Sequence, residues 1–395
     1  MRRRHQRLVV DRLRQSRNLS RAELAGYTSL SPPTVGKVAD ELIKAGLLEE
    51  YEPAGHDGEE VPAGRTKSEA ATLGRPARPL RLNRTTPRLI ALQIGVRHTR
   101  LAAIPIAPMP DATWPVSFNT PGRAKTWSAR LKQAAGKIKL AKPWAVTLSV
   151  PGVIDEQAGR VLLSPNLHWT EKADLVQLIR KVWNVPVIVS QEIRALALGH
   201  LAACPAELDF LLVDFGDGVG AALMQRGRLY HGTLPLTGEL GHTPIPGNGR
   251  PCGCGAIGCI ETLVSRPGLL ESFNAQRRGK RKRSWRDLNR TIEAGGLPAW
   301  LKKTLDATAT VVAGAMNLTG VKHVVITGSL TELPPPVVRY LGRAIERASM
   351  WARFGTIDIT DAPRRRAAGL ALTAIDRLLL PLNTSDTQQQ EAPMK

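Results

Sequence analysis

The sequence predicts an N-terminal winged helix-turn-helix domain followed by a larger α/β body with two lobes. Three observations support this prediction. The first fifty residues contain three short amphipathic segments with helix start signals. From residue 88 onward, strand patterns alternate with helix patterns in two successive sets. A glycine-rich segment, residues 238–261, holds three of the four cysteines beside a histidine, which is typical of a metal site.

Composition limits the class of protein. The chain of 395 residues is long enough for two or three domains. Its formal net charge of +21 favours a polyanionic partner, although a solvated basic surface would give the same composition. No apolar run approaches the about 20 residues of a membrane-spanning helix, and the N-terminus lacks a secretory apolar segment. We therefore expect a cytoplasmic protein with no membrane partner.

Two helices are expected before residue 30. The first spans residues 5–16, with arginines on its outer faces and an apolar face formed by Leu8, Val9 and Leu13. The second begins after Ser20, which forms a Ser-x-x-Glu capping box with Glu23, and it ends near Gly26.

A third helix begins at Ser31, where two prolines fit the first helical turn, and it stops at Gly46. Its apolar stripe consists of Val35, Val38, Leu42 and Ala45. Three helices of these lengths, with a tight turn between the last two, form a helix-turn-helix in which the third helix enters the DNA groove. Ser31, Thr34 and Lys37 are therefore the candidates to contact base edges or phosphates.

Residues 47–52 and 76–83 have the pattern of a strand and its return partner, so the segment between them would be a wing. This wing is long, and residues 53–73 have the polar composition of a disordered segment. At its end, Arg75 could enter a minor groove. The whole domain would cover residues 1–84. A three-helix protein-interaction module is the alternative, and the basic first helix favours double-stranded DNA.

The body is expected to span residues 85–383, with a disordered tail at 384–395. A hairpin and a buried strand open its first set of elements. The expected strands are 89–95, 99–106, 144–150, 185–190, 210–215, 219–225 and 323–327, and the expected helices are 125–138, 174–183, 192–203, 300–318, 337–349 and 365–380. Two such sets indicate two similar lobes with a cleft between them.

His242, Cys252, Cys254 and Cys259 form the ligand set of a closed tetrahedral zinc site, and the surrounding glycines let a short loop fold around one ion. The alternative is a glycine-rich loop with unrelated reduced thiols, or a disulfide. Because three thiolates and one imidazole leave no position for a water, the zinc would be structural. The fourth cysteine, Cys204, has the pattern of an ordinary buried thiol.

The motif series resembles the ROK family, which holds bacterial sugar kinases and sugar-responsive repressors. The resemblance is carried by the zinc signature in Glu239–His242, Cys252–Gly255 and Gly258–Glu261, by the sugar-contacting turn Ser164–Trp169, which lacks a Pro-Gly before the Trp, and by Ser149–Asp155. It implies an actin-like, ribonuclease H-like fold of the sugar-kinase type for the body. A winged helix in front of such a body resembles the family's xylose and N-acetylglucosamine repressor type.

The same resemblance implies that the body is not an enzyme. Gln93 stands where the family's kinases have the aspartate of their first phosphate loop, and Glu192 stands where they have the catalytic base. Gly216–Gly220 resembles the second phosphate loop, but its Asp217 would oppose a phosphate, and a tight hairpin explains the same glycines. Ile326–Ser329 resembles an adenosine-side loop or a plain strand-end turn. The alternative is a ROK-type sugar kinase with an added DNA-binding domain.

The resemblance also assigns the groups that would contact a sugar effector: Asn166, Gln191, Glu192, Glu239, His242 and Glu261. The alternative for each carboxylate is a partner of the zinc histidine or a surface group. A bound sugar would change the spacing of two winged helices in a homodimer or dimer of dimers on a pseudo-palindromic operator. A third hypothesis treats the body only as a zinc-stabilised dimerisation scaffold. The basic run 277–286 either touches DNA or is a solvated loop.

Overall fold

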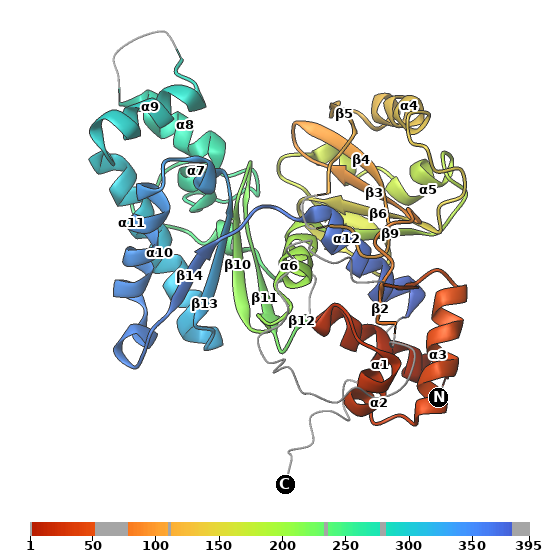
Figure 1. Ribbon diagram of the computed structural model, residues 1–395. Coiled ribbons are helices and arrows are strands. Elements are labelled where there is room, and N and C mark those ends of the chain that lie inside the picture. The colour runs from red at the N-terminus through yellow and green to blue at the C-terminus, as the bar shows by residue number, and fades with distance from the viewer. Residues whose placement is uncertain (1, 52–77, 110–111, 233–235, 277–281, 381–395) are drawn as a thin grey trace. The chain divides into compact units, whose positions relative to one another are not determined.

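The structure is a computed structural model that describes residues 2–51, 78–109, 112–232, 236–276 and 282–380 (Figure 1). The chain divides into two compact units: the first is Met1–Thr86 together with the segment from Leu380, and the second is Pro87–Leu379. The predicted wing segment 53–73, Arg75 and the tail 384–395 lie outside the described residues.

The first unit consists of three helices and a two-stranded antiparallel sheet. The elements are α1 (Arg2–Ser16), α2 (Arg21–Thr28), α3 (Pro32–Lys44), β1 (Leu48–Glu50) and β2 (Leu80–Leu82). Leu48 pairs with Leu82, so the two strands flank the segment predicted as a wing. The capping box is confirmed, because the Ser20 hydroxyl accepts from the Glu23 amide and the Glu23 carboxylate accepts from the Ser20 amide.

Several details of these helices differ from the prediction. Helix α2 continues past Gly26 to Thr28, because the chain takes the left-handed conformation only at Ser29. In α1, Val10 is buried and Leu8 is exposed. Leu8 and Val10 lie on opposite sides of Val9, and packing against α3 and β2 selects the Val10 side. In α3 the buried stripe includes Ala39, whereas Ala45 is exposed.

The second unit contains two five-stranded sheets with the same pattern of two antiparallel pairings followed by two parallel ones. The first sheet has the order β5-β4-β3-β6-β9, and the second has the order β12-β11-β10-β13-β14. Their strands are β3 (Leu89–Ile94), β4 (His98–Ile104), β5 (Val116–Asn119), β6 (Ala145–Val150), β9 (Val187–Gln191), β10 (Phe210–Phe215), β11 (Val219–Gln225), β12 (Arg228–Leu229), β13 (His323–Gly328) and β14 (Asp358–Asp361). The repeated pattern confirms two similar lobes.

Within the described residues of this unit, six helices accompany the two sheets: α4 (Ala124–Ala135), α5 (Leu175–Arg180), α6 (Glu192–Ala203), α10 (Ala299–Thr319), α11 (Pro336–Ala348) and α12 (Arg366–Ala374). Each agrees with a predicted helix within a few residues, except that α12 passes into a π-helical turn, Ile375–Leu379, instead of continuing as an α-helix. In the described part of the chain, the helices are all too short or too polar to cross a membrane.

Some elements were not predicted. They are the hairpin of β7 (Val153–Asp155) and β8 (Arg160–Leu163), the strands β5, β12 and β14, and the helices α7 (Glu261–Val264), α8 (Arg266–Ala275) and α9 (Trp285–Gly295). Of the two alternatives for the basic run 277–286, the solvated loop does not extend to its end, because Ser284 caps α9 through a second capping box with Asp287. Residues 277–281 lie outside the described residues.

Helices α6 and α12 are in contact through their backbones. A Cβ added to Gly369 would overlap the Ala195 carbonyl oxygen and lie 2.9 Å from the Gly199 nitrogen, and one added to Gly199 would lie 2.8 Å from the Arg365 carbonyl carbon. Helix α12 contacts β3 and β6 of the first sheet, and α6 contacts β10 and β11 of the second. This glycine contact therefore lies where the two lobes meet (Figure 1).

Candidate functional site

A cavity of about 390 Å³ lies between the two lobes of the second unit. It is lined by residues at the carboxyl ends of parallel strands, among them Gln93 of β3, Gln191 of β9 and Asp214 of β10. Ligands of open α/β sheets bind at this edge because the loops that follow the strands converge there. All six residues predicted to contact a sugar line this one cavity.

One end of the cavity is formed by carboxylates and amides. The Gln191 side-chain amide donates to Glu239 over 3.0 Å, which links β9 of the first lobe to the loop that precedes the cysteines. The Val219 amide donates to Glu261 over 2.7 Å. Burial raises the pKa of both Glu239 and Glu261 above the usual range. A Cβ on Gly218 would lie 3.6 Å from the Asn166 amide nitrogen, so Asn166 faces the same end.

The four predicted metal ligands converge. The Cys252 sulfur lies 3.5 Å from His242 Nδ1, the Cys254 and Cys259 sulfurs are 3.7 Å apart, and all four ligand atoms lie within 4.8 Å of one another. A tetrahedron with Zn–S bonds of about 2.3 Å has edges of about 3.8 Å, so these separations suit one zinc ion. Burial and the two neighbouring thiols raise the pKa of the Cys259 thiol to about 12, which a bound cation would reverse.

His242 joins the cysteine cluster to the cavity. Its Nδ1 faces the Cys252 sulfur, whereas its Nε2 lies 3.6 Å from the Glu239 carboxylate. A metal on Nδ1 would fix the tautomer with a proton on Nε2 and would hold the ring edge toward the cavity. A metal in the cysteine cluster would therefore hold His242, and through it the carboxylate end of the cavity, in position.

A second group, His200, Cys204 and Glu207, also brings possible ligand atoms together. His200 Nε2 and the Glu207 carboxylate are 2.7 Å apart, a hydrogen-bond distance shorter than the separation of two ligands around one ion. Cys204 is half-buried, so the prediction of a buried thiol is wrong in degree. We interpret this group as a hydrogen-bonded cluster.

The opposite end of the cavity is formed by ion pairs. The Glu192 carboxylate accepts from the Gln93 amide at 3.0 Å and from Arg366 Nε at 2.6 Å. A carboxylate with an arginine and an amide already bound is poorly placed to take a proton from a substrate hydroxyl. Glu192 lines the cavity as predicted, but as the partner of a buried arginine.

Arg364 lies against two glycine-containing loops, Gly216–Gly220 and Ile326–Ser329, which resemble the phosphate and adenosine loops of the family's kinases. Its guanidinium forms a bidentate pair with Asp214 at 2.6 and 2.9 Å. Added Cβ atoms on Gly216 and Gly328 would lie 2.5 and 2.6 Å from its Nη2. Burial alone would lower the pKa of Arg364, but the charge and hydrogen bonds of Asp214 raise it overall. The space against both loops is thus filled by a side chain of the protein itself.

A further ion pair joins the turn after β3 to the turn after β10. Arg97 Nε donates to the Asp217 carboxylate over 3.0 Å. The sequence placed Asp217 where it would repel a phosphate, and the structure gives it an arginine from the other lobe as its partner. The two loops that resemble kinase phosphate loops are therefore bound to each other.

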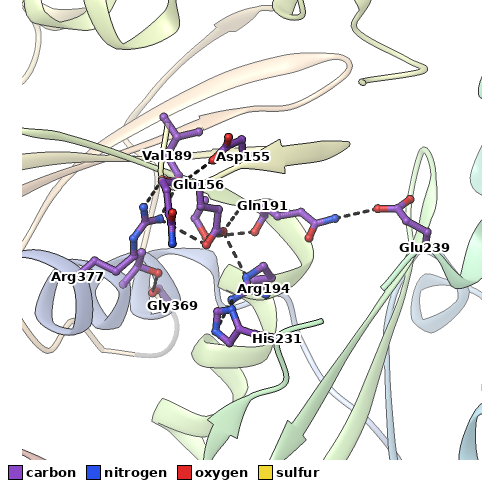
Figure 2. A network of polar contacts seen from close by, with 12 residues as sticks. Asp155, Glu156, Val189, Gln191, Arg194, His231, Glu239, Gly369 and Arg377 are labelled. Carbon is purple, nitrogen blue, oxygen red and sulfur yellow. Dashed lines mark hydrogen bonds and ion pairs between the residues drawn. The ribbon is translucent and has the colours of Figure 1, made fainter. Parts of the chain in front are cut away.

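Figure 2 shows a polar network that continues from the cavity into the first lobe. The Glu156 carboxylate accepts from the Gln191 backbone amide at 2.9 Å and forms ion pairs with Arg194 and Arg377. Arg194 is buried in α6 and its Nη2 lies 2.8 Å from His231 Nε2. Gln191 thus links Glu239 at the cavity to the side chains around Glu156.

Sequence reasoning did not find Glu156, Arg194, Arg364 or Arg366. One signal was available for Arg194, because it is a charged residue within the buried run Ile193–Leu201 of α6. A charge in such a run requires a partner. Arg364 and Arg366 belong to a basic triplet at the start of α12, and their role depends on contacts with residues 150 and 174 positions away.

The residues predicted to contact DNA lie at the start of α3. The Ser31 hydroxyl caps the helix and lies 2.8 Å from the Thr34 hydroxyl. Ser31 and Lys37 are exposed, and Thr34 is half-buried. Helix capping thus uses part of the hydrogen-bonding capacity of Ser31, and Lys37 is the freely exposed charge of the three.

Comparison with known proteins gives concordant matches. The ROK family profile matches residues 128–371. The chain is 26% identical to the xylose repressor of Caldicellulosiruptor bescii over 67% of this chain, and the match spans 64% of that repressor's own length. It is 26% identical to the DNA-binding transcriptional dual regulator NagC of Escherichia coli over 80% of this chain and 77% of NagC.

Among solved structures, a ROK family transcriptional regulator, a homologue of the E. coli Mlc protein, superposes with a TM-score of 0.72 at 20% identity. The match covers 96% of this chain and 98% of that one. At this identity the likeness establishes the fold, including the actin-like body with its mixed sheets.

Proposed function

Since the chain belongs to the ROK family, we propose that it is a DNA-binding transcriptional regulator, a repressor, whose body binds a sugar without phosphorylating it. The carrying observation is that one cavity presents carboxylates and amides at one end, whereas at the other end Arg364, paired with Asp214, lies against both glycine loops. Regulators with the same family body are similar to this chain over most of its length.

The first unit supports DNA binding by its order of elements, three helices and a two-stranded sheet, which is that of a winged helix-turn-helix. Helix α3 would enter the major groove with Lys37 and Thr34 near its start, and Arg75 of the wing would reach the minor groove. The net charge of +21 supports a polyanionic partner. A cytoplasmic location and a pseudo-palindromic operator for a dimer, or a dimer of dimers, follow from this proposal.

The carboxylate end supports sugar binding. A sugar offers hydroxyls that donate and accept in fixed geometry, and Asn166, Glu239 and Glu261 present matching groups around one cavity. The zinc would hold the loop of His242 in shape, and its role would be structural.

Two features support the loss of kinase activity. The magnesium-binding carboxylate is replaced by Gln93, and Glu192 is bound by Arg366. Arg364 occupies the space against both glycine loops. A nucleotide would have to displace a bidentate, half-buried ion pair, which costs stability when one partner is left unpaired.

The proposed mechanism is a population shift. A sugar that contacts Glu239 competes with Gln191 for that carboxylate, and the Gln191–Glu239 hydrogen bond is one of the contacts that bridge the two lobes. The ligand would thus favour a different lobe arrangement, and the lobe arrangement would change operator affinity by a coupling free energy of about 1–3 kcal/mol.

Three measurements test the proposal. Isothermal titration with hexoses, pentoses and N-acetylhexosamines should give a ligand, and binding by none of them would refute the sugar site. Gel-shift affinity for the protein's own promoter DNA should fall steeply between low and physiological salt, and Lys37→Gln should reduce that salt dependence by about one phosphate contact. A coupled assay should give no hexose-dependent ATP turnover; turnover abolished by Glu192→Gln would instead identify a kinase.

A further inference from the structure

The two ends of the cavity differ in charge. One end carries the carboxylates Glu239 and Glu261. The other end is lined by five arginines and four carboxylates. Four pairs account for the acids: Arg366 with Glu192, Arg364 with Asp214, Arg97 with Asp217, and Arg266 with Glu332. Five minus four leaves one guanidinium, that of Arg100.

Arg100 lies on β4 directly opposite Gln93 of β3, so the two side chains are on the same face of the sheet and both line the cavity. Within the described residues, Arg100 has no hydrogen bond and no carboxylate within 4 Å. Burial, and then the positive charge of Arg366, lower its pKa, with a smaller opposing effect from Glu192 and a further lowering by Arg364. Arginine nevertheless stays protonated in proteins.

A half-buried cation without a counter-ion is costly, and the cost is removed when an anion binds. The kinase-like alternative would need a carboxylate here to hold magnesium, but position 93 is an amide and position 100 is a cation. The end of the cavity that would hold a metal-bound phosphate in a kinase therefore attracts an anion directly.

We infer that the ligand of this cavity is a sugar with an anionic substituent, a phosphate ester or a carboxylate, and that Arg100 binds that substituent with help from Arg97. The inference rests on the proposed function, because it requires the sugar itself to lie at the carboxylate end. One cavity of about 390 Å³ contains both ends, which is within the range for binding a small polar ligand.

Arg97 gives the anion a second effect. It is half exposed and paired with Asp217 of the other lobe. An anion bound at Arg100 competes with Asp217 for Arg97, because a guanidinium fork takes a phosphate or carboxylate as readily as a side-chain carboxylate. The charge of the ligand, and not only its hydroxyls, would then loosen the connection between the two loops.

The test is isothermal titration of the full-length, zinc-loaded protein at constant ionic strength with matched pairs. The pairs are glucose against glucose 6-phosphate, glucose against glucuronate, and N-acetylglucosamine against its 6-phosphate. We expect the anionic member of one pair to bind about 10- to 100-fold more tightly than its neutral counterpart, the range that one charge-assisted contact gives. The two kinds of pair distinguish a phosphate from a carboxylate.

Arg100→Gln should remove this difference, and Arg100→Lys should retain part of it. The control is Arg343→Gln, which removes one positive charge from the exposed surface of α11 and should leave the difference intact. Thermal melting of each variant shows whether it folds.

Equal affinity for the neutral and anionic members would overturn the inference and leave the proposed sugar site standing. A difference that persists in folded Arg100→Gln would overturn the role of Arg100. Binding by no member of any pair would count against both the inference and the proposed function.

Discussion

Replacing Gly369 by alanine tests the backbone contact between α6 and α12. The added Cβ would lie 2.6 Å from the Ala195 carbonyl carbon, whereas ordinary contacts begin near 3.4 Å, so the helices must separate by at least 0.8 Å (3.4 − 2.6). The obstacle is backbone and cannot change rotamer. Overpacking costs about 1–3 kcal/mol where side chains can adjust, so we expect about 3 kcal/mol or more here. At about 2 °C per kcal/mol for a unit of this size, the melting temperature should fall by about 6 °C or more.

The matched control is Gly314→Ala in α10, where an added Cβ meets nothing within 4 Å. This substitution removes glycine from an exposed helix interior and should stabilise the protein by about 0.5–1 kcal/mol. Urea unfolding of both variants, monitored by circular dichroism, measures the difference directly. A Gly369→Ala protein within about 1 kcal/mol of the parent would refute the reasoning, because it would mean that the helices are not in backbone contact.

The remaining predictions concern zinc, capping and pH. Cys254→Ser should lower the zinc content below one ion per chain, because losing a ligand should reduce metal affinity by more than the about 10- to 100-fold that follows loss of an outer-shell partner. Elemental analysis measures the zinc content, and a full complement in the variant would contradict the site. Ser20→Ala should destabilise the first unit by about 1 kcal/mol in urea unfolding, whereas Ser20→Gly should cost only a few tenths. Burial lowers the pKa of His200 below its ordinary 6.5. As the pH falls through about 6.5, His200 is therefore protonated in the unfolded chain before it is protonated in the folded protein, and the free energy of unfolding decreases. Urea midpoints between pH 7.5 and 5.5 should therefore fall less in His200→Gln than in the parent, and identical slopes would refute this.

The convergence of His242, Cys252, Cys254 and Cys259 could be predicted from sequence, because all four lie within one short segment of a composition typical of metal sites. The two lobes could also be predicted, because strand and helix periods repeat along the chain. Helix ends and faces were less accurate: Leu8 and Val10 both flank the apolar residue Val9, and only the packing of α1 against α3 decides between them.

The contents of the cavity's arginine end could not be predicted in the same way. Gln93 and Glu192 could be recognised from sequence as departures from the family's kinase motifs. The role of Glu192, however, depends on its ion pair with Arg366, which is 174 residues away. Ion pairs of this kind depend on tertiary contacts that have no local sequence signal. Short elements such as β5 and β14 were missed for a similar reason, since each is an edge strand defined by its neighbour.

The position of Arg364 has a consequence for any attempt to convert this body into a kinase. Aspartates at positions 93 and 192 would supply metal-binding and proton-accepting carboxylates, but the Arg364 guanidinium would still lie against Gly216 and Gly328. Removing Arg364 alone would leave Asp214 as an unpaired, half-buried charge, which costs stability. Under the proposed function, nucleotide binding would therefore require changes at Arg364 and Asp214 together, in addition to those at positions 93 and 192.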